Sequence, residues 1–140
     1  MRAWTTASPN EGSLALRVRI GGTAILFTGD AEREAEAAML DRRDTVAAVV
    51  LKVPHHGSRT SSAAPFVAAV APTLAVASLG AENRFGHPAR DVVARYRAAG
   101  VAFARTDRCG AVTVVPDGDG GFSAAAERAE CDALRMPRRP

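Results

Sequence analysis

The segment from Val49 to Ser62 constrains this chain more than any other. It reads Val-Val-Leu-Lys-Val-Pro-His-His-Gly-Ser-Arg-Thr-Ser-Ser, an apolar run that stops at a proline and opens onto two histidines, a glycine and several hydroxyls. A short apolar run bounded by proline and glycine is typical of a buried strand, and binding groups tend to lie on the loops that such strands hold. Two of the three histidines of the protein lie here, so we expect its chemistry at this loop.

Composition is that of a soluble globular protein. The 140 residues are enough for one domain with a substantial core, and 47% are hydrophobic and 24% charged. Aromatic residues make up 5%, so the core must be mainly aliphatic. The formal net charge of +3 permits contact with anions without requiring it. The chain has no apolar stretch long enough for a transmembrane helix, and its first residues lack the apolar core of a signal peptide.

The chain as far as Val115 predicts a β-hairpin followed by alternating helices and strands. Ser13–Ile20 alternates apolar and polar residues, which indicates a half-buried strand, and Gly21-Gly22 is a two-residue turn before a returning strand at Thr23–Thr28. Further strands are expected at Ala47–Val53, Thr73–Leu79, Val101–Arg105 and Ala111–Val115, with a polar turn at Asp107–Gly110 before the last. Helices are expected at Ala31–Leu40, around Phe66–Val70 after a Ser61 or Ser62 cap with Pro65 in the first turn, and from Pro88 to Gly100.

The last 25 residues show no such pattern. From Pro116 onward we expect a flexible tail with one helical turn (116–140). Asp117 and Asp119 resemble the start of a calcium loop, but the position that needs glutamate holds Arg128, and we reject that interpretation. Cys109 and Cys131 do not have the spacing of metal ligands, so we expect free thiols, with one disulfide as the alternative.

Asp30 follows a glycine at the end of a predicted strand and precedes a predicted helix. The plain interpretation is a helix N-cap, since aspartate there accepts hydrogen bonds from the amides of the first turn. The alternative is a carboxylate at the mouth of the sheet that bridges two cations, as a two-metal hydrolytic site requires.

His55 and His56 are adjacent, so they would not point the same way from a regular strand. One is expected to bind a metal and the other to orient substrate, and the residues alone leave open which. Gly57 allows a ligand to approach the backbone closely. Neighbouring donors suit phosphate oxygens, namely Ser58, Arg59, Thr60 and Ser61. The plain alternative is a solvated loop that caps a helix.

Two residues outside this loop are further candidates. Lys52, the only lysine, is a candidate catalytic cation, although pairing with an acidic neighbour would also account for it. His87, in Asn83-Arg-Phe-Gly-His-Pro88, is a candidate helix cap, proton carrier or third metal ligand. A serine hydrolase is a weak interpretation, because the chain has no Gly-x-Ser-x-Gly segment.

Five segments occur in an order that is specific when they are taken together. They are Ser13-Leu-Ala-Leu, Leu26-Phe-Thr-Gly-Asp30, Leu51–Ser62, Asn83–Pro88 and Arg105-Thr-Asp107. In combination they resemble the second half of the metallo-β-lactamase-like domain of ComEC-type competence DNA-uptake proteins. The resemblance covers roughly residues 4 to 115, and Pro-His-His-Gly-Ser and Asn-Arg-Phe-Gly-His-Pro are its most specific parts.

The resemblance implies an α/β fold that is half of a four-layer αββα sandwich, with a metal site at one edge of the two sheets. It implies that Asp30 bridges two divalent ions, zinc or manganese, in the complete domain and, by analogy, that His56 is a ligand. His55, His87 and Lys52 would then be the catalytic groups. Substrate-binding groups would be Ser58, Arg59, Thr60, Asn83 and Arg84.

The function implied is that of a nuclease. In the competence family the whole protein is an integral membrane channel that takes up single-stranded DNA, and this domain is thought to degrade the other strand. That places the domain on the extracytoplasmic face of the bacterial inner membrane.

The chain departs from the family because it contains no His-x-His-x-Asp-His segment. Asp30 and His56 supply two ligands, or three if His87 reaches the site, whereas a catalytic zinc usually has three protein ligands. Residues 1–115 would therefore be a partial domain with weak or single metal occupancy and poor activity. Half a sandwich would also expose one sheet face, which favours self-association or a partner, either the missing N-terminal half or the membrane channel portion.

Two other functions stay open. One is a non-catalytic fragment that binds DNA weakly through Arg59, Arg84 and their neighbours. The other is a superfamily hydrolase acting on a small phosphate ester or lactone.

Overall fold

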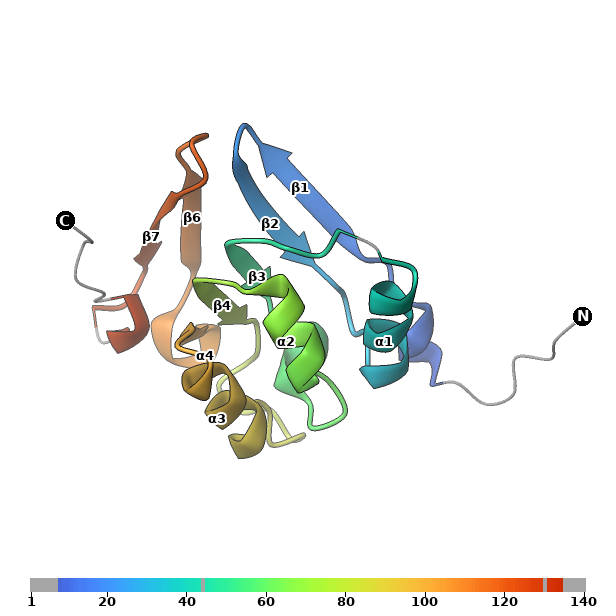
Figure 1. Ribbon diagram of the computed structural model, residues 1–140. Coiled ribbons are helices and arrows are strands. Elements are labelled where there is room, and N and C mark those ends of the chain that lie inside the picture. The colour runs from blue at the N-terminus through green and yellow to red at the C-terminus, as the bar shows by residue number, and fades with distance from the viewer. Residues whose placement is uncertain (1–7, 44, 130, 135–140) are drawn as a thin grey trace, which may run out of the picture.

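A five-stranded sheet forms the centre of the protein. The structure is a computed structural model that describes residues 8–43, 45–129 and 131–134 (Figure 1). The strands follow in the order β1 (Leu16–Ile20), β2 (Thr23–Phe27), β3 (Val50–Lys52), β4 (Leu74–Ala77) and β5 (Ala102–Arg105). The first two strands are antiparallel and the remaining neighbours are parallel. The predicted α/β class and the hairpin at Gly21-Gly22 are therefore confirmed.

Helices cover one face of this sheet, because parallel neighbours must be joined by crossover connections. They are α1 (Arg33–Asp41), α2 (Ala64–Val70) and α3 (Arg90–Ala98). Their buried side chains meet those of the sheet in the larger core, which includes Leu26, Leu51, Ala75 and Phe103 from strands and Met39, Phe66, Val67, Val92 and Tyr96 from helices. No helix in the described part of the chain is long and apolar enough to cross a membrane.

A buried carboxylate caps α2. Pro65 lies in the first turn as predicted, but neither predicted serine is the cap. Instead Glu36, on α1, accepts hydrogen bonds from the backbone N–H groups of Ser62 and Ala63 at 2.6 and 2.8 Å. Burial raises the pKa of Glu36, although these hydrogen bonds oppose the rise. The cap prediction is wrong because the acceptor comes from a neighbouring helix, which local sequence does not reveal.

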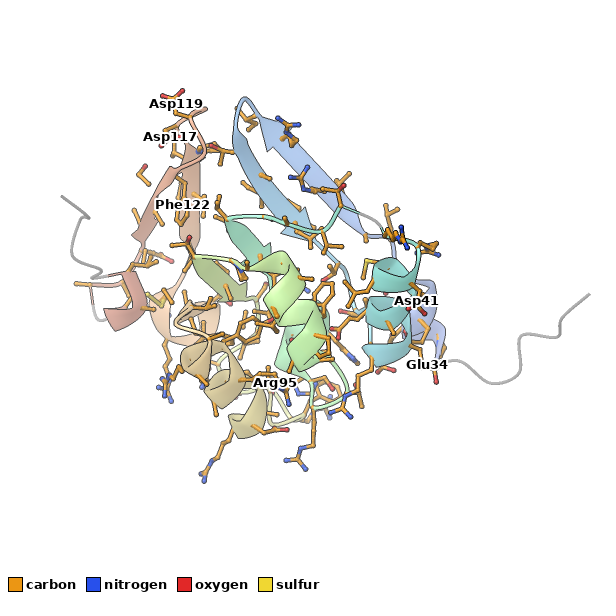
Figure 2. All side chains as sticks on the ribbon, viewed as in Figure 1. Glu34, Asp41, Arg95, Asp117, Asp119 and Phe122 are labelled. Atoms are coloured by element: carbon orange, nitrogen blue, oxygen red, sulfur yellow. A yellow bond between two sulfur atoms is a disulfide. The ribbon has the colours of Figure 1, made fainter. Side chains whose placement is uncertain are left out.

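A second, smaller layer lies on the other face of the sheet. It contains α4 (Thr106–Cys109), the antiparallel strands β6 (Val112–Pro116) and β7 (Phe122–Ala126), and a 3-10 turn, η3 (Asp132–Leu134). Figure 2 shows Phe122 within this layer. Its side chains form the second core with the sheet residues Val50, Leu74 and Ala104.

This layer corrects two predictions. The expected polar turn at 107–110 is mostly a turn of helix, and the expected tail after Pro116 contains β7 and η3. The strand was missed because Phe122-Ser-Ala-Ala-Ala126 is rich in alanine, which has low β propensity. Every second residue of β7 is partly buried against the five-stranded sheet, which is distant in sequence.

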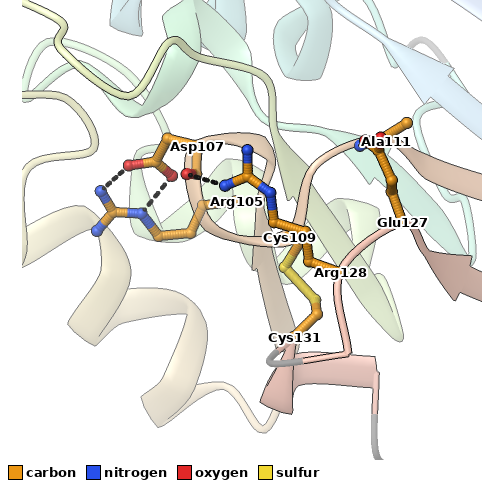
Figure 3. Close-up of a disulfide and its surroundings, with 7 residues drawn as sticks. All are labelled: Arg105, Asp107, Cys109, Ala111, Glu127, Arg128 and Cys131. Carbon is orange, nitrogen blue, oxygen red and sulfur yellow. Dashed lines mark hydrogen bonds and ion pairs between the residues drawn. A yellow bond between two sulfur atoms is a disulfide. The ribbon is translucent and has the colours of Figure 1, made fainter.

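Cys109 and Cys131 form a disulfide across 22 positions of sequence (Figure 3). The expectation of free thiols is wrong, and the disulfide alternative is confirmed. The β6–β7 hairpin returns the chain to the end of α4, which brings the two Cα atoms to 4.7 Å. An additional hydrogen bond joins the Arg128 guanidinium to the Asp107 carbonyl at 3.3 Å.

The tips of the two hairpins touch. Gly22 N–H donates to the Gly118 carbonyl at 2.6 Å, and the Thr23 hydroxyl donates to the Gly121 carbonyl at 2.8 Å. A Cβ atom on Gly21 would lie 2.3 Å from the Gly118 oxygen, so this approach requires glycine. Asp117, at the same tip (Figure 2), accepts hydrogen bonds from backbone N–H groups of its own turn.

Part of the sheet is left open on the side of the second layer. Cross-strand pairing places Leu16 opposite Phe27 and Val18 opposite Ile25 on this face. Leu16, Ile20 and Phe27 are 53%, 50% and 43% exposed. The alternation of β1 was predicted, but its apolar side is exposed rather than buried. An uncovered sheet face, expected from the resemblance, is therefore present along β1 and β2.

Candidate metal centre and active site

The histidine loop has a left-handed backbone at its centre. Pro54–Gly57 forms a 3-10 turn in which His55 and His56 have φ of 44° and 55°, a region that costs a non-glycine residue about 1 kcal/mol or more. Hydrogen bonds hold the loop on both sides. His55 N–H donates to the Gly29 carbonyl at 3.1 Å, and Ala89 N–H donates to the Gly57 carbonyl at 2.8 Å.

His56 and Asp30 face each other. Nε2 of His56 lies 3.2 Å from Oδ1 of Asp30, and both side chains are about two-fifths exposed, at 42% and 43%. Nδ1 of His56 lies within hydrogen-bond distance of the Ser78 carbonyl, which can only accept. Nδ1 therefore carries the proton, and in the neutral ring Nε2 presents a lone pair toward a carboxylate oxygen. Histidines that bind metals are typically oriented by such a hydrogen bond from the other ring nitrogen.

Asp30 does not cap the following helix. That helix begins at Arg33, and no side-chain cap is formed at its first residue. Glu11 instead accepts hydrogen bonds from Glu34 N–H and Ala35 N–H at 3.3 and 2.6 Å. The N-cap interpretation of Asp30 is wrong, because a carboxylate from the distant 3-10 turn Pro9–Gly12 (η1) accepts these hydrogen bonds, and Asp30 faces His56 instead.

His55 lies beside a second carboxylate, that of Glu32. Nδ1 of His55 is 3.2 Å from Oε1 of Glu32, and the two side chains are 22% and 16% exposed. Glu32 also accepts hydrogen bonds from the Thr60 hydroxyl at 3.0 Å and the Asn10 amide at 3.3 Å. Burial alone would raise the pKa of Glu32, but the hydrogen bonds and His55 together hold it below its ordinary value. Glu32 is thus an anion at neutral pH within ion-pair distance of the His55 ring, although Nδ1 of His55 makes no hydrogen bond.

His87 completes a cluster of all three histidines. Its ring centroid lies 5.8 Å from that of His55, and the centroids of His55 and His56 are 6.4 Å apart. Burial lowers the pKa of His87, and the neighbouring histidines lower it further. The Asn83 side chain fixes the position of His87, accepting from its N–H at 2.8 Å and donating to its carbonyl at 2.9 Å.

Lys52 lies at the same end of the sheet. Its Nζ donates to the Gly29 carbonyl at 3.2 Å, one residue before Asp30. Burial lowers the pKa of Lys52, and the charge of Asp30 opposes this. The ammonium group thus contacts a backbone carbonyl and forms no ion pair with Asp30, whose charge acts on it from a greater distance.

The predicted substrate-binding residues divide into two groups. Ser58 and Thr60 hydroxyls bond to each other at 3.0 Å, and the Asn83 side chain bonds to backbone. These three groups therefore hold the loops in place. The side chains of Arg59 and Arg84 are exposed, and Nε of Arg59 lies 3.7 Å from Asp91.

Sequence reasoning missed several residues that position this site. Ser13 accepts a hydrogen bond from Asp30 N–H at 3.2 Å. Thr106 bonds twice to the backbone of Leu79, at 2.8 and 2.9 Å, next to the carbonyl that orients His56. Thr106 lies within the quoted Arg-Thr-Asp segment, so a signal existed. Ser78 acts only through its backbone carbonyl, which no side-chain pattern reveals.

Asp30 and His56 are the predicted metal ligands, and the structure brings their side chains together. Across residues 8–43, 45–129 and 131–134, no group of three or more histidine, cysteine, aspartate or glutamate side chains could hold a metal ion. His87 therefore does not complete a three-ligand set. A carboxylate oxygen and an imidazole lone pair 3.2 Å apart are nonetheless both donors that suit zinc or manganese.

Comparison with known proteins identifies the family of this chain. The Metallo-beta-lactamase superfamily matches residues 5–81. The chain is 42% identical over 104 residues to "Competence protein ComA" of Neisseria gonorrhoeae and 36% identical over 106 residues to "ComE operon protein 3" of Bacillus subtilis (strain 168). It is 40% identical over 106 residues to "Uncharacterized protein YcaI" of Escherichia coli (strain K12).

These matches cover 74%, 76% and 75% of this chain but 15%, 14% and 14% of the respective relatives. The chain thus spans about one seventh of the length of the curated relatives that it matches. No solved structure matches it.

Proposed function

This chain belongs to the metallo-beta-lactamase superfamily and is homologous to part of ComEC-type competence proteins, and from that premise we propose that it is part of a metal-dependent phosphodiesterase, the nuclease portion of a DNA-uptake protein. One observation carries the proposal. His56 is oriented by the Ser78 carbonyl so that its Nε2 lone pair faces the Asp30 carboxylate at 3.2 Å. In the neutral ring the Nε2 lone pair and the carboxylate oxygen repel each other, and a cation held between them, a metal ion or a proton on Nε2, relieves that repulsion.

Asp30 and His56 would hold the metal, and the two donors fit zinc or manganese. When bound, a pair of divalent cations lowers the pKa of water and neutralises charge on phosphoryl oxygens. The described residues contain no group of three or more metal-binding side chains, and we propose that the other ligands come from an upstream part of a longer protein. That arrangement supports two ions in the complete domain and weak or single occupancy in this chain.

The remaining residues of the site would handle protons and phosphate. His55, whose Nδ1 lies 3.2 Å from the Glu32 carboxylate, would accept or donate a proton next to the metal ligands. His87, whose ring contacts that of His55, has a lowered pKa and favours the neutral form that can take up a proton. Lys52 places a cation near Asp30, and the exposed side chains of Arg84 and of Arg59, which lies beside Asp91, would meet a phosphate backbone.

The open face of β1 and β2 supports an upstream partner. Leu16, Ile20 and Phe27 are about half exposed, and exposed apolar patches on soluble proteins mark interfaces. We propose that the first half of the sandwich packs on this face in the longer protein. Without that half, two copies of this chain would associate through the same residues.

The disulfide supports an extracytoplasmic location. Cys109 and Cys131 are joined, and disulfides persist in oxidising compartments and are rare in the bacterial cytosol. A nuclease that acts on incoming DNA outside the inner membrane would fold in such a compartment.

Metal analysis tests the proposal. The chain would be produced joined to its upstream half and its bound zinc and manganese measured by elemental analysis. We expect close to two ions per chain, falling by at least one in Asp30→Ala and in His56→Ala. Asp119→Ala, which removes an exposed carboxylate at the hairpin tip (Figure 2), is the matched control and should keep both ions. Full metal content in Asp30→Ala would refute the assignment of that ligand.

A non-catalytic DNA-binding fragment is the second candidate, and the presence of only two metal donors among the described residues favours it for the isolated chain. Incubation of the chain with DNA in manganese or zinc separates the two. The second candidate requires salt-sensitive binding without cleavage. Cleavage that is abolished by His56→Ala would exclude it.

A further inference from the structure

The loop between β4 and α3 presents an aromatic ring to solvent. Phe85 is 79% exposed, which is unusual for a phenylalanine. Its position is fixed locally, because the Asn83 side chain bonds to both backbone groups of His87 and to the Gly80 carbonyl at 3.4 Å. The loop thus holds an apolar ring in solvent, and packing of the core does not require the ring to lie there.

The exposed ring is continuous with the candidate active site. Phe85 stacks on His87, with ring centroids 5.8 Å apart and an interplanar angle of 21°, and His87 meets His55 edge-on, also at 5.8 Å. One face of Phe85 therefore lies against His87, and the high exposure of the side chain leaves the other face accessible. A planar group that stacked on Phe85 would lie two rings away from His55.

Two exposed arginines lie on the loops of the site. Arg84 precedes Phe85 in the same loop, and Arg59, whose side chain is 79% exposed and lies 3.7 Å from Asp91, is on the histidine loop. An accessible aromatic face beside arginine side chains is the combination with which proteins hold single-stranded nucleic acid, because every base has a π-face and every linkage a phosphate. An apolar protein partner would require a contiguous patch, and Phe85 is instead a single ring among polar and charged neighbours in Glu82-Asn-Arg-Phe-Gly.

We propose that Phe85 is a base-stacking platform that binds an unpaired nucleobase next to the histidine cluster. The inference rests on the proposed nuclease function and deepens it, since it makes the substrate a single-stranded or frayed end rather than an intact duplex. Phe85 would position the strand, and Arg59 and Arg84 would contact its phosphates.

Binding of two matched single-stranded oligonucleotides to the 140-residue chain tests the platform. Fluorescence anisotropy would compare a labelled single-stranded oligonucleotide with an abasic strand of the same length, which keeps the phosphates and lacks the bases. Phe85→Ala is expected to weaken binding of the normal strand about 5- to 100-fold and to leave the abasic strand within about twofold. Phe85→Trp should retain or strengthen base-dependent binding, whereas Phe85→Leu should resemble Phe85→Ala.

Leu14→Ala is the matched control, because Leu14 is 80% exposed and lies outside the loop. It should change neither affinity. Equal binding of the normal and abasic strands, no binding of either, or a Phe85→Ala variant with unchanged affinity would each overturn the platform.

Failure of the nuclease proposal would look different. Base-dependent binding that is lost in Phe85→Ala, with no cleavage when the upstream half and metal are supplied, would support the platform and refute the nuclease. Metal-dependent cleavage that is equally fast on normal and abasic strands, and unaffected by Phe85→Ala, would support the nuclease and refute the platform.

Discussion

The two faces of the five-stranded sheet are closed to different degrees. On the helical face, Leu51 and Ala75 are fully buried by α1, α2 and α3. On the opposite face, the β6–β7 layer covers the sheet near Val50 and Leu74, while Leu16 and Ile20 on β1 remain half exposed. Crossover helices close the first face with residues adjacent in sequence, because parallel strands require such connections. The second face is closed only where the chain returns to it.

The disulfide anchors the partly closed face, and its removal is the largest change that we expect. A Cys109→Ala and Cys131→Ala double variant loses a cross-link that encloses 22 positions of sequence, which corresponds to about 3 kcal/mol in the free energy of unfolding. Urea denaturation would measure the loss. Reduction of the disulfide in the unsubstituted chain should lower its free energy of unfolding by a similar amount, seen as a lower urea midpoint. A midpoint insensitive to reductant would show that the hairpin layer is held without the cross-link.

The fully closed face depends on a buried carboxylate. Glu36→Ala leaves Ser62 N–H and Ala63 N–H without their acceptor, and we expect a loss of about 2 kcal/mol, since buried donors without partners cost about 1–3 kcal/mol each and the variant no longer buries a carboxylate. Thermal or urea unfolding measures it. Glu34→Ala, at an exposed position of the same helix (Figure 2), should stay within about 0.5 kcal/mol. Equal effects of the two substitutions would contradict the role of Glu36.

Glu36→Gln separates charge from hydrogen bonding by its pH dependence. The pKa of Glu36 is raised in the folded chain, so the unfolded chain loses the proton first as pH rises. The unsubstituted chain should therefore lose stability relative to Glu36→Gln from about pH 4.3 upward. Below that pH both folded and unfolded chains hold the proton, and the relative stability should not change with pH.

Local sequence predicted the first hairpin and the start of α2 better than the β6–β7 layer. The β1–β2 turn at Gly21-Gly22 and Pro65 at the start of α2 carry their own signals, and both predictions are confirmed. Strand β7 and the disulfide carry none, because an alanine-rich strand and two distant thiols become informative only when the chain folds back onto the sheet. The missed features are therefore the non-local ones.

The same distinction applies to the site. The three histidines and Asp30 were identified from the residues themselves, and the structure gathers them at one end of the sheet. The groups that surround them were missed, because Ser78 acts through a carbonyl and Glu32 comes close to His55 only in the folded chain. The histidines and Asp30 can be identified by residue type, whereas the groups around them depend on which parts of the backbone lie nearby in the fold.

The open face yields the smallest effect on stability in the isolated chain. In a Leu16→Ser and Phe27→Ser double variant, we expect the free energy of unfolding to change by less than about 0.5 kcal/mol, since both side chains are already near half exposed. Sedimentation velocity should show less self-association than in the unsubstituted chain. Val115→Ser, at a residue that is 56% exposed on β6, is the matched control and should leave association unchanged.

Joined to the upstream half, the same double variant should behave differently. If that half covers β1 and β2, Leu16 and Phe27 become buried, and their replacement by serine should cost about 2 kcal/mol or more. Unfolding of the longer protein measures this cost against the value for the isolated chain. An equally small effect in both would show that the first half of the sandwich packs elsewhere. The face along β1 and β2 would then stay exposed in the complete protein as well.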